Sequence, residues 1–121
     1  MNKVILTGNL TKDPELRKTN NGTNVVSSTV AVSRDRKDAD GNYGTDFINF
    51  VAWGAQADYL ANYGNKGDRV ELCGRWQVRQ YENNSGQTVT VNEVHVESLS
   101  VFSKQPNQTR LKEVETDDLP F

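Results

Sequence analysis

Most of the chain follows the two-residue alternation of apolar and polar side chains that is typical of β-strands. Turn signals rich in Gly, Asn and Asp separate these stretches. The clearest strand is DFINFVAW at residues 46–53, where Ile48 and Phe50 share one side and Phe47 and Trp53 share the other. The pattern predicts five strands, at residues 3–10, 24–34, 46–53, 69–81 and 87–102.

One stretch has helical spacing instead, AQADYLANY at residues 55–63. Five strands with one helix between the third and the fourth is the element order of an OB-fold, a small Greek-key barrel. We therefore predict an all-β fold with one short helix, a five-stranded OB-fold barrel over residues 1–102. The last strand changes its apolar parity midway, which predicts a bulge near Asn92 or Glu93.

The strand at residues 69–81 separates a polar side from an apolar side. Arg75, Arg79 and Tyr81 share the polar side. A cationic row that ends in an aromatic ring suits a single strand of nucleic acid, because guanidinium groups pair with phosphates and an unpaired base stacks on the ring at ~1–3 kcal/mol. Trp76 falls on the apolar side, so we expect it in the core.

Phe47 and Trp53 have two possible locations. Large aromatic side chains are more often buried than exposed, so either ring taken alone is expected in the core. However, Ile48, Phe50 and Ala52 already supply an inward side, and a small barrel does not need a strand that is buried on both sides. We therefore expect Phe47 and Trp53 on the surface, where they can stack on bases.

Charge and composition exclude several classes of protein. Lys plus Arg total 14 and Asp plus Glu total 16, a net charge of −2, so binding of nucleic acid by bulk positive charge is not expected. The longest apolar run, residues 50–53, is too short for a transmembrane helix or a signal peptide. The single Cys73 points to a reducing compartment, and we expect a cytoplasmic location. Neither Cys73 nor the single His95 has partners at metal or nucleophile spacing, so we expect no metal, no cofactor and no enzyme activity.

The composition changes after residue 102. Residues 103–112 are polar and read as a short linker, and residues 113–121 form an acidic tip; both are expected to be disordered. Acidic tails usually only solubilise a protein. The last five residues also suit a peptide whose ring enters a pocket of a partner protein while its carboxylates meet basic residues. They are Asp117, Asp118, Leu119, Pro120 and Phe121.

Several motifs resemble the bacterial and phage single-stranded DNA-binding proteins. The matching segments are NKVILTGNL at 2–10, DPELR at 13–17, FINFVAW at 47–53, YGNKG at 63–67, Gly74, the hairpin from Tyr81 to Gly86 and the DDLPF tip. The resemblance implies an OB-fold that wraps single-stranded DNA, commonly as a homotetramer. It also implies that the tip recruits replication, repair and recombination proteins.

The stacking positions of that family fall on Phe47, Trp53 and Tyr81. A fourth, often Trp, aligns with Arg36, which removes one ring and leaves a cation. The linker is shorter than the Gly-, Gln- or Pro-rich stretch of many family members, which fits a phage-encoded or accessory member acting in the bacterial cytoplasm or nucleoid.

We thus predict a sequence-tolerant binder of single-stranded DNA whose bases stack on these three rings. An OB-fold adaptor that mainly binds proteins and an RNA chaperone remain as alternatives. The side chains expected to meet phosphates are Arg75, Arg79, Arg34, Arg36 and Lys3.

Overall fold

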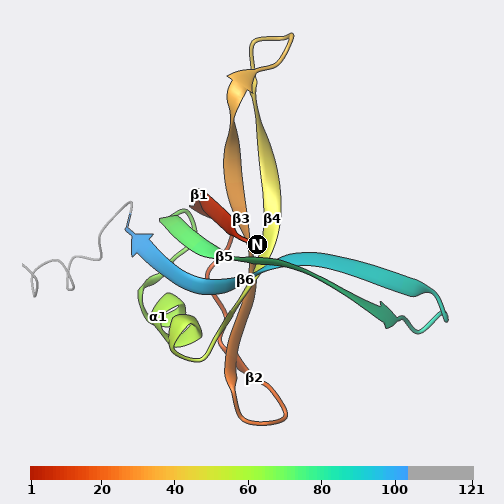
Figure 1. Ribbon diagram of the computed structural model, residues 1–121. Helices are drawn as coiled ribbons and strands as arrows, with labels where there is room; N and C mark the ends of the chain where they lie inside the picture. The colour runs from red at the N-terminus through yellow and green to blue at the C-terminus, as the bar shows by residue number, and fades with distance from the viewer. Residues whose placement is uncertain (104–121) are drawn as a thin grey trace, which may run out of the picture.

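The computed structural model describes residues 1–103 of the chain. The expected linker beyond Ser103 and the expected acidic tip therefore lie outside the described residues. The elements, in chain order, are β1 (Val4–Leu10), β2 (Arg17–Lys18), β3 (Asn24–Lys37), β4 (Tyr43–Trp53), α1 (Ala55–Tyr63), β5 (Arg69–Glu82) and β6 (Thr88–Phe102) (Figure 1).

Five of the strands close into a barrel. They pair in the order β1, β5, β6, β4, β3, and β1 pairs again with β3 to complete the ring. All of these pairings are antiparallel except β4 with β6, which run parallel through Phe50 opposite Val94. This confirms the predicted five-stranded OB-fold. The two-residue β2, which the sequence pattern did not predict, only extends the sheet beside β3.

The barrel is filled by side chains from the inward-facing positions of its strands. Phe50 is the largest fully buried side chain, with 1% of its surface exposed. It packs with inward residues of the other strands, and Ala57 and Leu60 of α1 belong to the same apolar cluster. Strand alternation and helical spacing therefore direct their apolar positions to one common core.

Two hairpins extend beyond the barrel as arms, which Figure 1 shows rising at the top and projecting to the right. The β3–β4 arm comprises residues 31–47, and the β5–β6 arm comprises residues 76–94. Both strands of the β3–β4 arm are longer at their turn end than the alternation predicted, because β3 continues to Lys37 and β4 begins at Tyr43. Residues 33–43 carry no buried side chain, so the end of this arm is held by its backbone pairing and by an ion pair between Arg34 and Asp46, and not by the core.

Trp76 is where the expected core assignment is wrong. Its side chain is 41% exposed, and Val78 on the same side of the strand is also exposed. The alternation placed Trp76 correctly on the side of Leu72 and Gly74, but β5 has left the barrel by this point. The inward side therefore has no core to face.

The arm departs where β5 and β6 change register. Cys73 pairs with Ser98 and Gly74 with Val96, so Glu97 is the extra residue of a bulge, and the bulge expected near Asn92 or Glu93 is not there. A Cβ on Gly74 would lie 2.1 Å from the carbonyl oxygen of His95. Only glycine allows so close an approach of two strands.

The described residues contain no helix long and apolar enough to cross a membrane.

Candidate nucleic-acid interface

The pairing register places the predicted rings and two of the predicted arginines on one sheet surface. Paired residues project to the same side of a sheet. Phe47, Val51 and Trp53 share one side of β4, Val51 pairs with His95 of β6, and His95 pairs with Arg75 of β5. We call this surface the outer face; from β4 to β5 its positions are Phe47, Asn49, Val51, Trp53, Val89, Val91, Glu93, His95, Arg75, Gln77, Arg79 and Tyr81.

The β4 part of the outer face carries two exposed rings. Phe47 is 67% exposed and Trp53 is 41% exposed, as the alternation predicted. Phe47 pairs with the small Ala31 of β3, so nothing bulky on the neighbouring strand covers its ring. Between the rings, Asn49 accepts a hydrogen bond on its side-chain oxygen from the Thr29 hydroxyl at 2.9 Å. The two rings are thus presented with an oriented amide between them.

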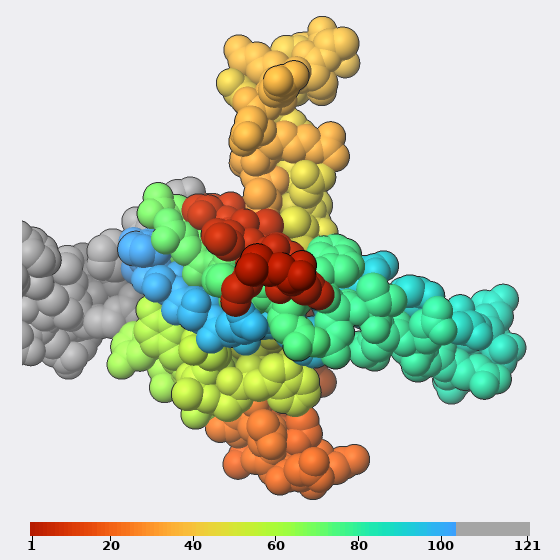
Figure 2. Space-filling view, viewed as in Figure 1, coloured from red at the N-terminus to blue at the C-terminus, as the bar shows by residue number. Residues whose placement is uncertain are grey.

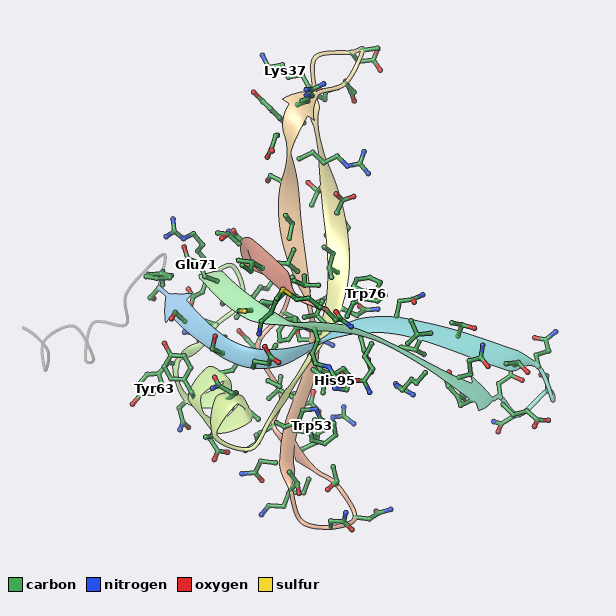
Figure 3. The ribbon with its side chains drawn as sticks, in the orientation of Figure 1. Lys37, Trp53, Tyr63, Glu71, Trp76 and His95 are labelled. Atoms are coloured by element: carbon green, nitrogen blue, oxygen red, sulfur yellow. The ribbon has the colours of Figure 1, made fainter. Side chains whose placement is uncertain are left out.

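A buried carboxylate connects the aromatic and the cationic parts of the outer face. One oxygen of Glu93 accepts a hydrogen bond from Arg79 Nε at 3.0 Å and lies 3.1 Å from His95 Nε2. The His95 ring in turn stacks on Trp53, with centroids 6.3 Å apart and planes 30° apart (Figure 3). Glu93 therefore holds both His95, which stacks on Trp53, and Arg79.

Arg79 also orients the third ring. Its guanidinium carbon lies 5.8 Å from the centroid of Tyr81, a cation–π arrangement. The ion pair with Glu93 uses Nε, and the Arg79 side chain remains 55% exposed, so its other N–H groups can reach a phosphate. Arg75 donates to the side-chain oxygen of Gln77 at 3.3 Å and forms no ion pair within residues 1–103.

The structure does not bring the remaining predicted cations onto the outer face. Asp46 precedes Phe47 on β4 and pairs with Val32 of β3, so its side chain lies on the opposite side of the sheet from Phe47. Arg34 forms a two-pronged ion pair with this Asp46, with Nη2 to Oδ1 at 2.8 Å and Nε to Oδ2 at 3.2 Å. Hydrogen bonding and opposite charge raise the pKa of Arg34 and lower that of Asp46.

Arg36 and Lys3 have different surroundings. Arg36 lines a groove near the end of the β3–β4 arm together with Arg34, Lys37 and two aspartates. Lys3, just before β1, forms an ion pair with Glu97, the bulge residue, and this partner raises its pKa. A phosphate at Lys3 or Arg34 would therefore compete with a carboxylate of the protein itself.

Releasing Arg34 from its carboxylate is expected to strengthen binding of single-stranded DNA. In Asp46→Asn, affinity for oligo-dT should rise about 2- to 5-fold, as for the loss of an exposed ion pair. The slope of log K against log salt should steepen by up to about 0.7 as one more cation becomes available to phosphate. Because the pKa of Asp46 is lowered, the ion pair is complete at neutral pH and is lost only in acid. Titrations at several salt concentrations measure both effects.

Asp35→Asn is the matched control for this variant. It removes the same charge from the same arm, but Asp35 forms no ion pair within the described residues. Equal behaviour of the two variants would mean that net charge, and not the release of Arg34, accounts for the change.

The sequence did not identify Glu93 or His95 as members of the site. Both lie on β6 at positions whose neighbours depend on the parallel pairing with β4 and on the register with β5. Only a known register would have placed His95 beside Trp53.

The fold and the site together define a class of protein. The chain is an OB-fold barrel with exposed rings and arginines on one sheet surface, and the described residues contain no cluster of metal-ligating side chains. The sequence profile of the single-strand binding protein family matches residues 1–102, and the chain belongs to this family.

Individual relatives agree with this assignment. A single-stranded DNA-binding protein of Halalkalibacterium halodurans is 44% identical over 110 residues, 91% of this chain and 66% of the relative. Single-stranded DNA-binding protein A of Bacillus subtilis is 48% identical over 99 residues, 82% of this chain and 58% of the relative. Single-stranded DNA-binding protein 1 of Streptococcus pyogenes is 41% identical over 120 residues, 99% of this chain and 92% of the relative.

The chain thus spans less than two thirds of the length of the first two relatives. Family membership agrees with the prediction that the chain is a binding protein and not an enzyme.

Proposed function

We propose that this chain binds single-stranded DNA with little sequence preference, through the outer face. The observation that supports this most strongly is the convergence of Phe47, Trp53 and Tyr81, from two strands, on one surface with Arg75 and Arg79. The names of the relatives, all single-stranded DNA-binding proteins, support the same choice of ligand.

The arrangement accounts for both strand selectivity and sequence tolerance. Unpaired bases expose their faces and can stack on the three rings, whereas the bases of a duplex are already stacked on each other. Every base has such a face, so stacking does not distinguish sequences. The arginines meet phosphates between the stacked bases, and because few cations take part, the salt dependence is modest for a DNA-binding protein.

This function is tested by measuring binding to four labelled ligands: oligo-dT, a mixed-sequence single strand of DNA, a duplex of the same length, and oligo-rU. Fluorescence anisotropy at moderate salt should show similar affinity for the two DNA strands and much weaker binding to the duplex. A weak or absent preference for single strands would favour the protein-binding OB-fold adaptor. Preference for oligo-rU would favour an RNA chaperone.

We further propose that the tip at residues 113–121 recruits proteins of replication, recombination and repair, and that the segment before it, residues 103–112, acts as a linker. The support is the apolar Leu-Pro-Phe end beside two acids. Deletion of residues 117–121 should abolish capture of such partners and leave oligo-dT affinity unchanged. Capture that persists after the deletion would contradict the role of the tip.

The assembly is proposed to be a homotetramer in the bacterial cytoplasm or nucleoid, encoded by a bacterium or a phage. Native mass spectrometry with and without oligo-dT gives the subunit count and the DNA stoichiometry together.

A further inference from the structure

A groove lies at the base of the two arms, where β4 separates from β6. Its volume is about 460 Å³, and it is lined by Phe47 and Asn49 of β4, by Trp76 of β5 and by Thr90 and Asn92 of β6, among others. Figure 2 shows the β3–β4 arm rising above the body of the molecule and the β5–β6 arm projecting to the right, apart from the first. The groove is continuous with the outer face because Phe47 belongs to both.

The backbone of Trp76 is held firmly at this position. The Asn2 side chain donates to the Trp76 carbonyl at 2.7 Å and accepts from the Trp76 N–H at 2.8 Å. On its other edge β5 continues the ladder with β6, where Trp76 pairs with the buried Val94. The backbone that carries this 41% exposed indole is therefore fixed from both edges and does not have to be ordered when a ligand binds.

We propose that Trp76 is a further DNA-contacting residue, and that an unpaired base of the bound strand enters the groove between Phe47 and Trp76. This inference rests on the proposed function and adds a fourth ring to it. Trp76 lies on the opposite side of β5 from Tyr81, so the DNA strand would pass from the outer face into the angle between the arms (Figure 3).

The side chains that line the groove suit an unpaired base better than a positively charged ligand. None of the described side chains that line it is acidic, whereas the groove near the end of the β3–β4 arm includes Asp35 and Asp38. The Asn49 oxygen is already engaged by Thr29, so its amide N–H groups are directed elsewhere and can donate to a carbonyl oxygen on the edge of a base.

Substitution of Trp76 separates this inference from the proposed function. Trp76→Ala should weaken binding of labelled oligo-dT about 5- to 150-fold, the range for loss of one base–aromatic stack, and Trp76→Phe should restore most of it. Val78→Ala is the matched control, because Val78 is exposed on the same side of β5 and does not line the groove. It should leave the affinity unchanged.

A fluorescence measurement keeps the inference testable if Trp76→Ala does not fold. The chain has two tryptophans, so Trp53→Phe leaves Trp76 as the only indole. Saturation of this variant with oligo-dT should quench its tryptophan emission. Unchanged emission overturns the inference, as does an unchanged affinity of folded Trp76→Ala.

The outcomes distinguish the two levels of the proposal. If Trp53→Ala loses affinity while Trp76→Ala does not, the proposed function stands and the role of Trp76 falls. If Trp76→Ala changes the native mass of the assembly but not the affinity per subunit, the ring belongs to a contact between copies of the chain, and the inference is overturned. If the unmodified chain does not bind oligo-dT, both proposals fall.

Discussion

Replacement of Phe50 by alanine is expected to lower the free energy of unfolding by about 3–5 kcal/mol. Phe50 is the largest side chain at the centre of the barrel and is only 1% exposed. Its removal gives up the transfer free energy of the ring and leaves a cavity that the surrounding strands cannot fill, because the closed hydrogen-bonded ring of the barrel resists collapse. Urea denaturation followed by circular dichroism measures the change.

The matched control lies three residues earlier on the same strand. Phe47 is the same residue type but is 67% exposed and directed away from the core. Phe47→Ala should change the free energy of unfolding by less than about 1 kcal/mol. If the two variants were equally destabilised, the assignment of inner and outer sides of β4 would be wrong.

Replacement of Trp53 by alanine is expected to weaken binding of single-stranded DNA about 5- to 150-fold. Trp53 stacks on His95, which is anchored by Glu93, so its ring offers a base one face of a pre-ordered stack. Preorganisation of this kind reduces the entropy that is lost on binding. Anisotropy titration with labelled oligo-dT measures the loss without depending on tryptophan emission.

A second variant of the same site shows whether stacking is the cause. Trp53→Phe retains a ring and should recover most of the affinity lost in Trp53→Ala. For both variants, the midpoint of denaturation should change no more than for other substitutions at exposed positions. If the unmodified chain, Trp53→Ala and Trp53→Phe all bound oligo-dT with the same affinity, the stacking role of Trp53 would be contradicted.

The sequence predicted the sides of the strands better than their surroundings. Alternation along residues 46–53 was sufficient to place Phe50 inside and Phe47 and Trp53 outside, because the side-chain period of a strand depends on the backbone alone. The same alternation put Trp76 on the inward side of β5, which is correct, but predicted burial, which is wrong. Burial depends on where the arm leaves the barrel, and that point is set by the bulge at Glu97 and the close strand approach at Gly74.

Contacts between distant strands were beyond the sequence pattern. The ion pair of Arg79 with Glu93 and the stacking of His95 on Trp53 both depend on the pairing register of β6 with its two neighbours. The engagement of Arg34 by Asp46 was equally hidden, since it needs the hairpin register of the β3–β4 arm. Local pattern therefore gave the fold and the three rings, whereas the register determines which charges remain available.

The central claim, that the outer face is where DNA lies, is tested most directly by photocrosslinking. Oligo-dT with iodouracil at single positions would be irradiated on the full chain, and the adducts would be located by mass spectrometry of peptides. If DNA lies on the outer face, adducts are expected at Phe47 and Trp53 on β4 and at Tyr81 on β5. Adducts confined to β1 or to α1, with none on β4 or β5, would contradict it.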